Sequence, residues 1–245
     1  MPNTPSSSPT TASPPSSRTT RPRTPRLAPA DRERQIIEGA IAYFAEVGFT
    51  GQTRELSARL GVTQPLLYRY FENKQALVER VYRTVFEGRW DPAWIELIED
   101  RALPLRERLV EFYRRYSKAT YRPDWIRIYL HAGLAQPELN RRYIGLVRRE
   151  LMPAYCRELR HECGLADTGT PVSEEEIEFV WALHGGIFYL ALRQHVYRTR
   201  IKVDFMTHVG FAVDNFLAGA RVTYPRLLET YAPGALGAEA ASHSA

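Results

Sequence analysis

Apolar side chains recur every three or four residues from Asp31 onward, and this spacing constrains the fold more than any other feature of the chain. In the first such run, Ile36, Ala40 and Phe44 share one helical face, and Gly48 follows as a stop signal. Strands would require a sustained alternation of apolar and polar residues, which the sequence lacks. The sequence therefore predicts an all-α fold. About nine helices are expected, at roughly 31–47, 53–60, 64–70, 74–85, 105–121, 125–135, 138–163, 173–199 and 204–222.

Both ends of the chain lack the apolar residues that a packed core needs. Residues 1–29 are rich in Pro, Ser and Thr, and we expect them, like residues 231–245, to be disordered. Residues 1–30 hold four arginines and no acid, so they supply +4 of the net charge of +5. Two interpretations of this basic segment stay open. The first has no function in binding: the segment is a solvated leader or reflects a misassigned start codon. The second is a flexible arm that contacts DNA. Its eight prolines argue against the amphipathic helix of a transit peptide.

Cysteine content and hydropathy together indicate a cytoplasmic protein. Cys156 and Cys163 are the two cysteines, and one straight helix would hold them about 10 Å apart, too far for a disulfide. So few cysteines in a chain of this length are typical of a reducing compartment. No apolar run approaches the ~18 residues of a membrane span, so we expect no membrane partner.

Two short helices, expected at 53–60 and 64–70, follow the first long helix and are joined by a tight turn at Gly61-Val62. This order is typical of a helix-turn-helix unit, with the motif at about 52–71. A plain helical hairpin with tyrosines on its surface is the alternative. Three residues stay open as the N-cap of the first short helix: Thr50, Gln52 and Thr53.

The second short helix carries a proline near its start without conflict. Thr63 is its expected N-cap, so Pro65 falls in the first turn, where a missing amide hydrogen costs little. Leu67 and Phe71 stand four residues apart, and we expect both to turn inward. The polar aromatic side chains of the helix are then left on its open side.

Six sequence elements stand at fixed spacing across this region: Gly48-Phe49, Gly61-Val62-Thr63, Leu67-Tyr68, Phe71, Lys74 and Leu77. Together they resemble the TetR/AcrR family of bacterial transcriptional regulators, and the resemblance covers about residues 31–90. It implies a three-helix DNA-binding domain at 30–90 and a larger helical domain for ligand binding and dimerisation at 91–230. It also implies a homodimer that binds a palindromic operator in double-stranded DNA. As a repressor, this dimer would leave the operator when a small-molecule effector binds.

The same resemblance assigns residues to DNA contact. Phosphate contacts are implied for Thr53, Tyr68, Tyr70 and Lys74, and base-edge contacts for Gln64, Pro65 and Arg69, with Thr63 and Leu66 as further candidates. Glutamine suits adenine and arginine suits guanine. Leu66 departs from the small or hydroxyl-bearing residue that many members carry. It either contacts a thymine methyl group or turns inward.

The segment 103–171 is rich in aromatic residues, and such rings line either a core or a pocket for a small apolar ligand. The family resemblance favours the pocket, because its members usually bind an effector between their middle helices. Four residues are the pocket candidates: Tyr113, Trp125, Tyr129 and Trp181. The sequence does not identify the effector.

The last two expected helices carry broad apolar faces, which either close the core of a monomer or meet a second copy. Gly185-Gly186 in mid-helix costs about 1 kcal/mol per glycine relative to alanine, and close approach of a partner helix would explain both glycines. By resemblance we expect a four-helix dimer interface. Its candidate residues are Leu183, Gly186, Ile187, Leu190, Val209, Val213 and Phe216.

No catalytic, cofactor or metal motif stands out in the sequence. His161 lies two residues from Cys163, but no further His or Cys pair stands at zinc-site spacing. We expect His131, His184 and His195 to be hydrogen-bonded structural residues. The protein is therefore predicted to be no enzyme, and the alternative is a helical ligand carrier or enzyme that does not bind DNA.

Overall fold

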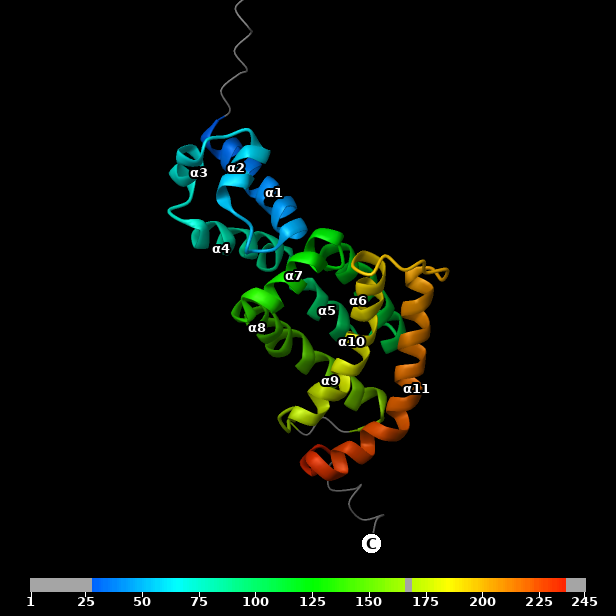
Figure 1. Cartoon of the computed structure of the whole chain (residues 1–245). Coiled ribbons are helices and arrows are strands. Elements are labelled where there is room, and N and C mark those ends of the chain that lie inside the picture. The colour runs from blue at the N-terminus through cyan, green and yellow to red at the C-terminus, as the bar shows by residue number, and fades with distance from the viewer. Residues whose placement is uncertain (1–27, 166–168, 237–245) are drawn as a thin grey trace, which may run out of the picture.

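A computed structural model describes residues 28–165 and 169–236, and most of the two expected tails lies outside these residues. Every regular element in the described ranges is a helix, so the predicted all-α fold is confirmed (Figure 1). The α-helices are α1 (Pro29–Val47), α2 (Thr53–Leu60), α3 (Gln64–Tyr70), α4 (Lys74–Val85), α5 (Ala93–Glu99), α6 (Leu105–Thr120), α7 (Pro123–Ala135), α8 (Pro137–Leu146), α9 (Met152–Glu162), α10 (Glu174–His195) and α11 (Phe205–Tyr231). Short helical turns are η1 (Glu87–Arg89), η2 (Val147–Leu151) and η3 (Pro233–Leu236).

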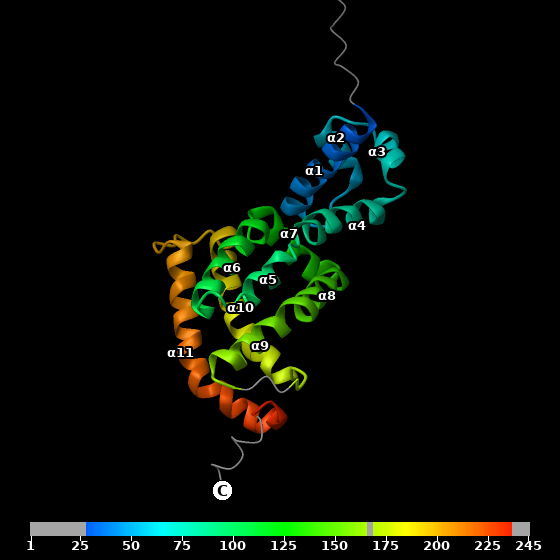
Figure 2. The same ribbon diagram turned by 180° about the vertical axis from the view of Figure 1, so that it is seen from behind.

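Helices α1 to α4 gather at one end of the molecule, and local signals set their boundaries (Figures 1 and 2). Gly61 ends α2 in the left-handed conformation, with φ 64°. Thr63 caps α3 by accepting a hydrogen bond from the Leu66 amide, and Asn73 caps α4 in the same way through the Ala76 amide. The predicted caps at Thr63 and Asn73 are therefore confirmed. Helix α2 follows Gln52, which makes no side-chain cap bond.

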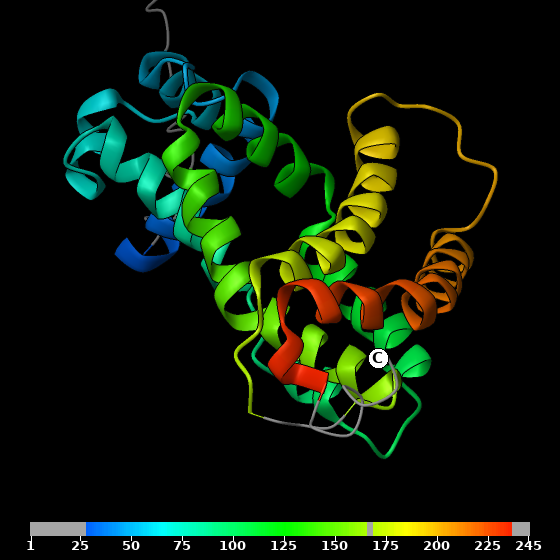
Figure 3. The same cartoon turned by 90° about the horizontal axis from the view of Figure 1, so that it is seen from below.

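The remaining helices form a larger body, in which α7 lies directly against α1. Helices α10 and α11 run side by side, and the chain between them, residues 196–204, extends away from the body (Figure 3). The predicted Ser173 cap of α10 is a full capping box with Glu176.

Three features of this body differ from the sequence expectation. Helix α5 was not anticipated, because seven residues give too short a pattern to recognise. The helix expected over 138–163 contains a π-helical segment at Val147–Leu151, which ends two residues before Pro153, whose missing amide hydrogen interrupts the regular ladder. Helix α11 continues to Tyr231 through Pro225 and bends toward its end (Figure 1).

Part of the segment expected as a C-terminal tail is ordered against the body. The turn η3 lies within 231–245, and its Ala235 is buried. The expectation of disorder from residue 231 onward is thus wrong for these residues, because an alanine and a leucine suffice to pack a short turn against neighbouring helices. Residues 237–245 lie outside the described part of the chain.

Two buried ion-pair groups join the helices of this body. Arg160 of α9 pairs with Glu176 of α10 at 2.7 Å, and Glu176 also accepts a hydrogen bond from Tyr224 of α11 at 2.8 Å. Arg108 of α6 pairs with Glu158 of α9 at 2.7 Å, and both side chains are buried. Each group satisfies its charges internally, which buried charges require. Among the described residues, no helix combines the length and apolar character that crossing a membrane requires.

Candidate nucleic-acid interface and ligand pocket

Helix α3 is held from behind by two apolar side chains. Leu67 has no exposed surface and Phe71 is 6% exposed, and both pack into the core that includes Leu56 of α2. The inward orientation predicted for Leu67 and Phe71 is therefore confirmed. The opposite side of α3 is free to present polar groups to a partner.

Three DNA-contact candidates form one hydrogen-bonded set on that outer side. The hydroxyl groups of Tyr68 and Thr53 lie 2.9 Å apart, and the Gln64 amide nitrogen donates to the Thr53 hydroxyl at 3.3 Å. Tyr68 is exposed, as are Pro65 and Arg69. The set joins α2 to α3, so it fixes the direction in which these polar groups face.

The other candidates are less open. Tyr70 is only partly exposed and packs against the core, so it does not lie fully on the open side as expected. Leu66 is also half-buried, and both alternatives for this residue stay open. Lys74 is half-buried in the first turn of α4, and the Thr63 hydroxyl is occupied by its capping bond. Tyr70, Leu66 and Lys74 therefore expose a smaller fraction of their surface than Tyr68 does, whereas Thr63 is exposed.

One exposed basic residue of this surface was not singled out from the sequence. Arg54 directly follows Thr53 on α2 and is exposed. The sequence feature that could have identified Arg54 is its position next to Thr53, a candidate phosphate contact. A positive charge at that place would attract a phosphate backbone.

A recess of about 380 Å³, including its open mouth, lies between α6, α7, α8 and α10. It is lined by Tyr116, Tyr121, Trp125, Tyr129, Tyr143, Ile144, Val147, Trp181, His184, Gly185 and Phe188. Three of the four pocket candidates, Trp125, Tyr129 and Trp181, are among them. Tyr113 is not, because it lies fully buried one layer further in, where its hydroxyl is 3.4 Å from Nδ1 of His184. The assignment of Tyr113 to the lining is therefore wrong.

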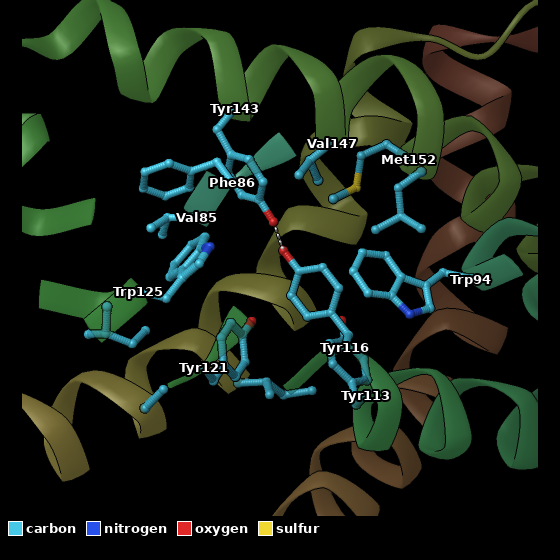
Figure 4. Close-up of a cluster of buried hydrophobic side chains, with 14 of the residues drawn as sticks. Val85, Phe86, Trp94, Tyr113, Tyr116, Tyr121, Trp125, Tyr143, Val147 and Met152 are labelled. Atoms are coloured by element: carbon cyan, nitrogen blue, oxygen red, sulfur yellow. Dashed lines mark hydrogen bonds between the residues drawn. The ribbon is translucent and has the colours of Figure 1, made fainter. Parts of the chain in front are cut away.

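The polar groups around the recess are uncharged. The Tyr116 and Tyr143 hydroxyls share a hydrogen bond of 2.7 Å (Figure 4). Burial lowers the pKa of His184 to about 4, so its imidazole is neutral at physiological pH. Burial likewise raises the pKa of Tyr116, Tyr121 and Tyr143, which keeps these phenols protonated.

Two buried polar atoms of lining residues have no hydrogen-bond partner within residues 28–165 and 169–236. These atoms are the indole nitrogen of Trp125 and the hydroxyl oxygen of Tyr121. Figure 4 shows both turned toward the space between the rings of Trp125, Tyr143, Tyr116 and Tyr121. Leaving such an atom unpaired costs about 1–3 kcal/mol, so an acceptor that reached them would bind favourably.

Sequence reasoning missed most of the polar lining. Tyr116, Tyr121 and Tyr143 were visible as members of an aromatic segment, but nothing local distinguished them from Tyr113 or Tyr155. Which of these rings borders an empty space depends on the helices that pack around it.

The dimer-interface candidates separate into core and surface residues. Leu183, Ile187, Leu190, Val209 and Val213 are buried inside the protomer. A buried side chain has no surface to offer a partner, so these five are corrected to core residues. Gly186 is exposed and Phe216 is half-buried.

Helices α10 and α11 each expose a different stripe at helical spacing. We call these residues the open face: Gly185, Gly186, Tyr189, Phe211, Gly219 and Val222. Tyr189 is 54% exposed, Phe211 65% and Val222 56%. A Cβ atom added at any of the three glycines would meet no atom within 4 Å. The open face is therefore apolar and partly flat, which suits a helix of a second chain.

The described residues hold no group of three or more His, Cys, Asp or Glu side chains that could bind a metal ion. Both cysteines are free thiols, and burial raises the pKa of Cys156 to about 12. A thiol with so high a pKa is not a nucleophile at neutral pH.

Comparison with known proteins identifies a family that the N-terminal part of the chain resembles. Residues 36–81 match the sequence profile of the tetR family of bacterial regulatory proteins. Over 106 residues the chain is 35% identical to tetracycline repressor protein class G of Vibrio anguillarum, which covers 43% of this chain and 48% of that protein. It is 33% identical over 85 residues to tetracycline repressor protein class A from transposon 1721 of Escherichia coli, which covers 31% and 39%. The chain thus spans at most about half the length of these relatives.

Solved structures share the fold over most of their length. A tetR-family transcriptional regulator from Streptomyces coelicolor superposes with a TM-score of 0.57 at 18% identity, covering 83% of this chain and 87% of that one. A TetR family transcriptional regulator from Pseudomonas syringae pv. tomato gives a TM-score of 0.51 at 17% identity, covering 84% and 98%. At such identities the likeness concerns the fold.

Proposed function

We propose that this chain, whose residues 36–81 match the TetR family of bacterial regulatory proteins, is a sequence-specific DNA-binding transcriptional regulator. The observation that carries the proposal is the outer side of α3, where the Thr53 hydroxyl bonds to both exposed Tyr68 and Gln64, while Leu67 anchors the helix from behind. A rigid short helix with an exposed polar side is what insertion into the major groove requires. In this assignment residues 30–90 bind DNA and residues 91–230 bind ligand and dimerise.

The exposed residues divide between two roles. The hydroxyl groups of Tyr68 and Thr53 contact phosphates, which position the protein without reading sequence. Arg69 and Gln64 contact base edges, where a good bidentate pair discriminates by about 1–3 kcal/mol. Gln64 is held by Thr53 in the free protein, so it must exchange this bond for one to a base.

The regulator is proposed to act as a homodimer. The open face of α10 and α11 supplies an apolar surface for a second copy, and its three glycines permit close helix approach. A twofold dimer presents two α3 helices to the same side of a duplex. The expected operator is therefore palindromic.

Two helices give the recess a mechanical connection to the DNA-binding helices. Helix α7 carries Trp125 of the lining and packs against α1. On α8, Tyr143 lines the recess, while the neighbouring Arg142 pairs with Glu79 of α4 at 2.9 Å and lies 4.3 Å from the centroid of the Tyr82 ring. A ligand that displaces Tyr143 would therefore shift the contact that positions α4. We propose that such a shift releases a repressor from its operator.

Selection of operator sequences from genomic and random duplexes by the purified full-length chain tests DNA binding. Tyr68→Phe keeps the ring and removes the hydroxyl, so it should weaken binding to all duplexes alike, by about 3- to 10-fold. Arg69→Ala should relax the preference at one base position, with a loss of about 5- to 150-fold on the operator. Tyr231→Phe, an exposed change far from α3, is the matched control.

Three results would contradict parts of this proposal. Failure to recover any preferred duplex would refute sequence-specific binding. Equal losses for Tyr68→Phe and Arg69→Ala on specific and random DNA would refute the division of roles. Tight ligand binding by a chain that binds no DNA would favour a helical ligand carrier instead.

A further inference from the structure

The recess between α6, α7, α8 and α10 has walls made almost entirely of aromatic rings. Trp125 and Tyr129 stack with centroids 5.0 Å apart and planes at 9°, and Phe188 meets Tyr129 edge-on at 5.4 Å. Tyr116 and Tyr143 close the side toward α6 and α8. Flat walls with face and edge contacts favour a planar aromatic guest over a branched aliphatic one.

The lining contains no Asp, Glu, Lys or Arg side chain. Its one ionisable base, His184, stays neutral because burial lowers its pKa to about 4. A charged guest would therefore lose its hydration without gaining a counter-charge, which is strongly unfavourable. Aromatic faces do attract cations, so a cationic guest is the strongest competitor to an uncharged one.

The unpaired polar atoms decide between these two guests. The Trp125 indole nitrogen can only donate a hydrogen bond, and it has no acceptor among the residues that the structure describes. An ammonium-type cation has no acceptor to offer and would leave this donor unpaired. A carbonyl oxygen accepts from Trp125, and it also accepts from the Tyr121 hydroxyl, which lacks a partner too.

Neither of these atoms has measurable exposed surface. A guest must therefore part the rings to reach them. Tyr143 is one of these rings, and its neighbour Arg142 contacts α4. The free energy gained when the guest pairs the two donors thus offsets the cost of displacing Tyr143, which the proposed regulation requires.

We propose that the recess binds an uncharged, planar molecule of one or two fused aromatic rings that carries a carbonyl-type acceptor oxygen, with Trp125 and Tyr121 as its hydrogen-bond donors. This inference rests on the proposed effector role of the recess. It adds the chemical class of the effector and the two residues that recognise its oxygen.

Four bicyclic probes of similar size separate charge from hydrogen bonding. Chromone is uncharged and carries a carbonyl, naphthalene has no acceptor, N-methylquinolinium is a cation, and 1-naphthoate is an anion. Calorimetric titration of the full-length protein without DNA should rank chromone first. We expect an advantage of about 3- to 10-fold over naphthalene and of 10-fold or more over both ions.

Two conservative variants test the donors. Trp125→Phe and Tyr121→Phe each keep an aromatic ring and remove a donor, so each should reduce the ratio of chromone affinity to naphthalene affinity. Tyr231→Phe, exposed and remote from the recess, should leave the ranking unchanged. The ranking in the unchanged protein is informative even where a variant folds poorly.

Several outcomes would overturn the inference. Tightest binding of N-methylquinolinium would identify a cation site, and absence of binding by all four probes would remove the recess as a site for this class. An undiminished chromone advantage in both variants would refute the two donors. Because these titrations contain no DNA, chromone binding that leaves operator affinity unchanged would refute the regulatory role alone. If the purified protein binds no DNA at all, the proposed function is refuted, but the proposed chemical class of the ligand is not affected.

Discussion

Replacing Glu176 by glutamine should destabilise the body of the protein more than any other single-atom exchange on α10. The Glu176 side chain has no exposed surface and accepts hydrogen bonds from Arg160 at 2.8 and 2.7 Å and from Tyr224 at 2.8 Å. It also accepts from the Ser173 amide at 2.8 Å, which closes the capping box. Glu176→Gln keeps the shape of the side chain and removes its charge. Arg160, itself 5% exposed, is then left without a counter-charge.

The expected loss follows from this geometry. Removing one partner of a buried ion pair costs about 3–5 kcal/mol, and the lower end applies because glutamine keeps one acceptor oxygen. For a protein of this size a loss of about 3 kcal/mol lowers the melting temperature by roughly 6–12 °C. Replacing Arg160 and Glu176 together by methionine should restore much of this loss, because no unpaired charge then remains.

The effect should also depend on pH. Burial raises the pKa of Glu176, but the hydrogen bonds from Arg160, Ser173 and Tyr224 outweigh it and leave the pKa below its ordinary value. The stability that comes from a depressed carboxyl pKa is present above the unfolded value of about 4.3 and is lost as the pH falls through the folded value. The gap between the native protein and Glu176→Gln should therefore narrow below about pH 4.

Thermal melts followed by circular dichroism between pH 3 and 8 measure both effects. Glu178→Gln on the same helix is the matched control, because Glu178 is 69% exposed and lies 4.0 Å from Arg148. Its melting temperature should stay within about 2 °C of the native value. A similarly small change for Glu176→Gln at pH 7, or a gap that does not narrow in acid, would refute the reasoning.

Three further predictions concern other parts of the molecule. Gly186→Glu should leave the protomer folded, because an added side chain meets open space there. It should yield monomers in sedimentation velocity, and a dimer of unchanged mass would contradict the proposal that the open face is the dimer interface. Arg142→Met removes the ion pairs with Glu79 and Glu87, so hydrogen exchange of the α4 amides should accelerate about fivefold. Unchanged exchange would refute the proposal that α8 positions α4 through Arg142. Because its pKa is lowered to about 4, His184 stays neutral in the folded protein between pH 6.5 and 4, whereas in the unfolded chain it takes up a proton. The free energy of unfolding should therefore fall by up to about 1.4 kcal/mol for each unit by which the pH is lowered across this range. His184→Gln should flatten this slope in melts across that range, and an equally steep slope would contradict it.

The helix boundaries of the N-terminal part could be predicted closely because local groups set them. The Thr63 hydroxyl bonds to an amide three residues away, and Gly61 ends α2 by its own backbone conformation. Leu67 and Phe71 could be placed inward because their spacing allows only one buried side for so short a helix. Signals of this kind act within a few residues, so a sequence displays them directly.

Which side of each longer helix is buried and which is exposed could not be predicted in the same way. Apolar residues surround much of α10, so the pattern alone did not separate buried Ile187 from the exposed stripe at Gly185 and Tyr189. The same ambiguity placed Tyr113 rather than Tyr116 in the lining of the recess. These two tyrosines stand three residues apart on one side of α6, and only the neighbouring helices determine which ring borders the empty space.

The sequence by itself determined that the protein is helical, where α3 and α4 begin, and that Tyr68 and Arg69 lie on α3 with Leu67 turned inward. The physical reason is that caps, turns and short amphipathic helices depend on contacts close along the chain. Tertiary structure decided which rings enclose the recess, which donors in it lack a partner, and which side of α10 and α11 remains open. Those features depend on how helices far apart in sequence pack against one another, as Glu176 of α10 meets Arg160 of α9 and Tyr224 of α11.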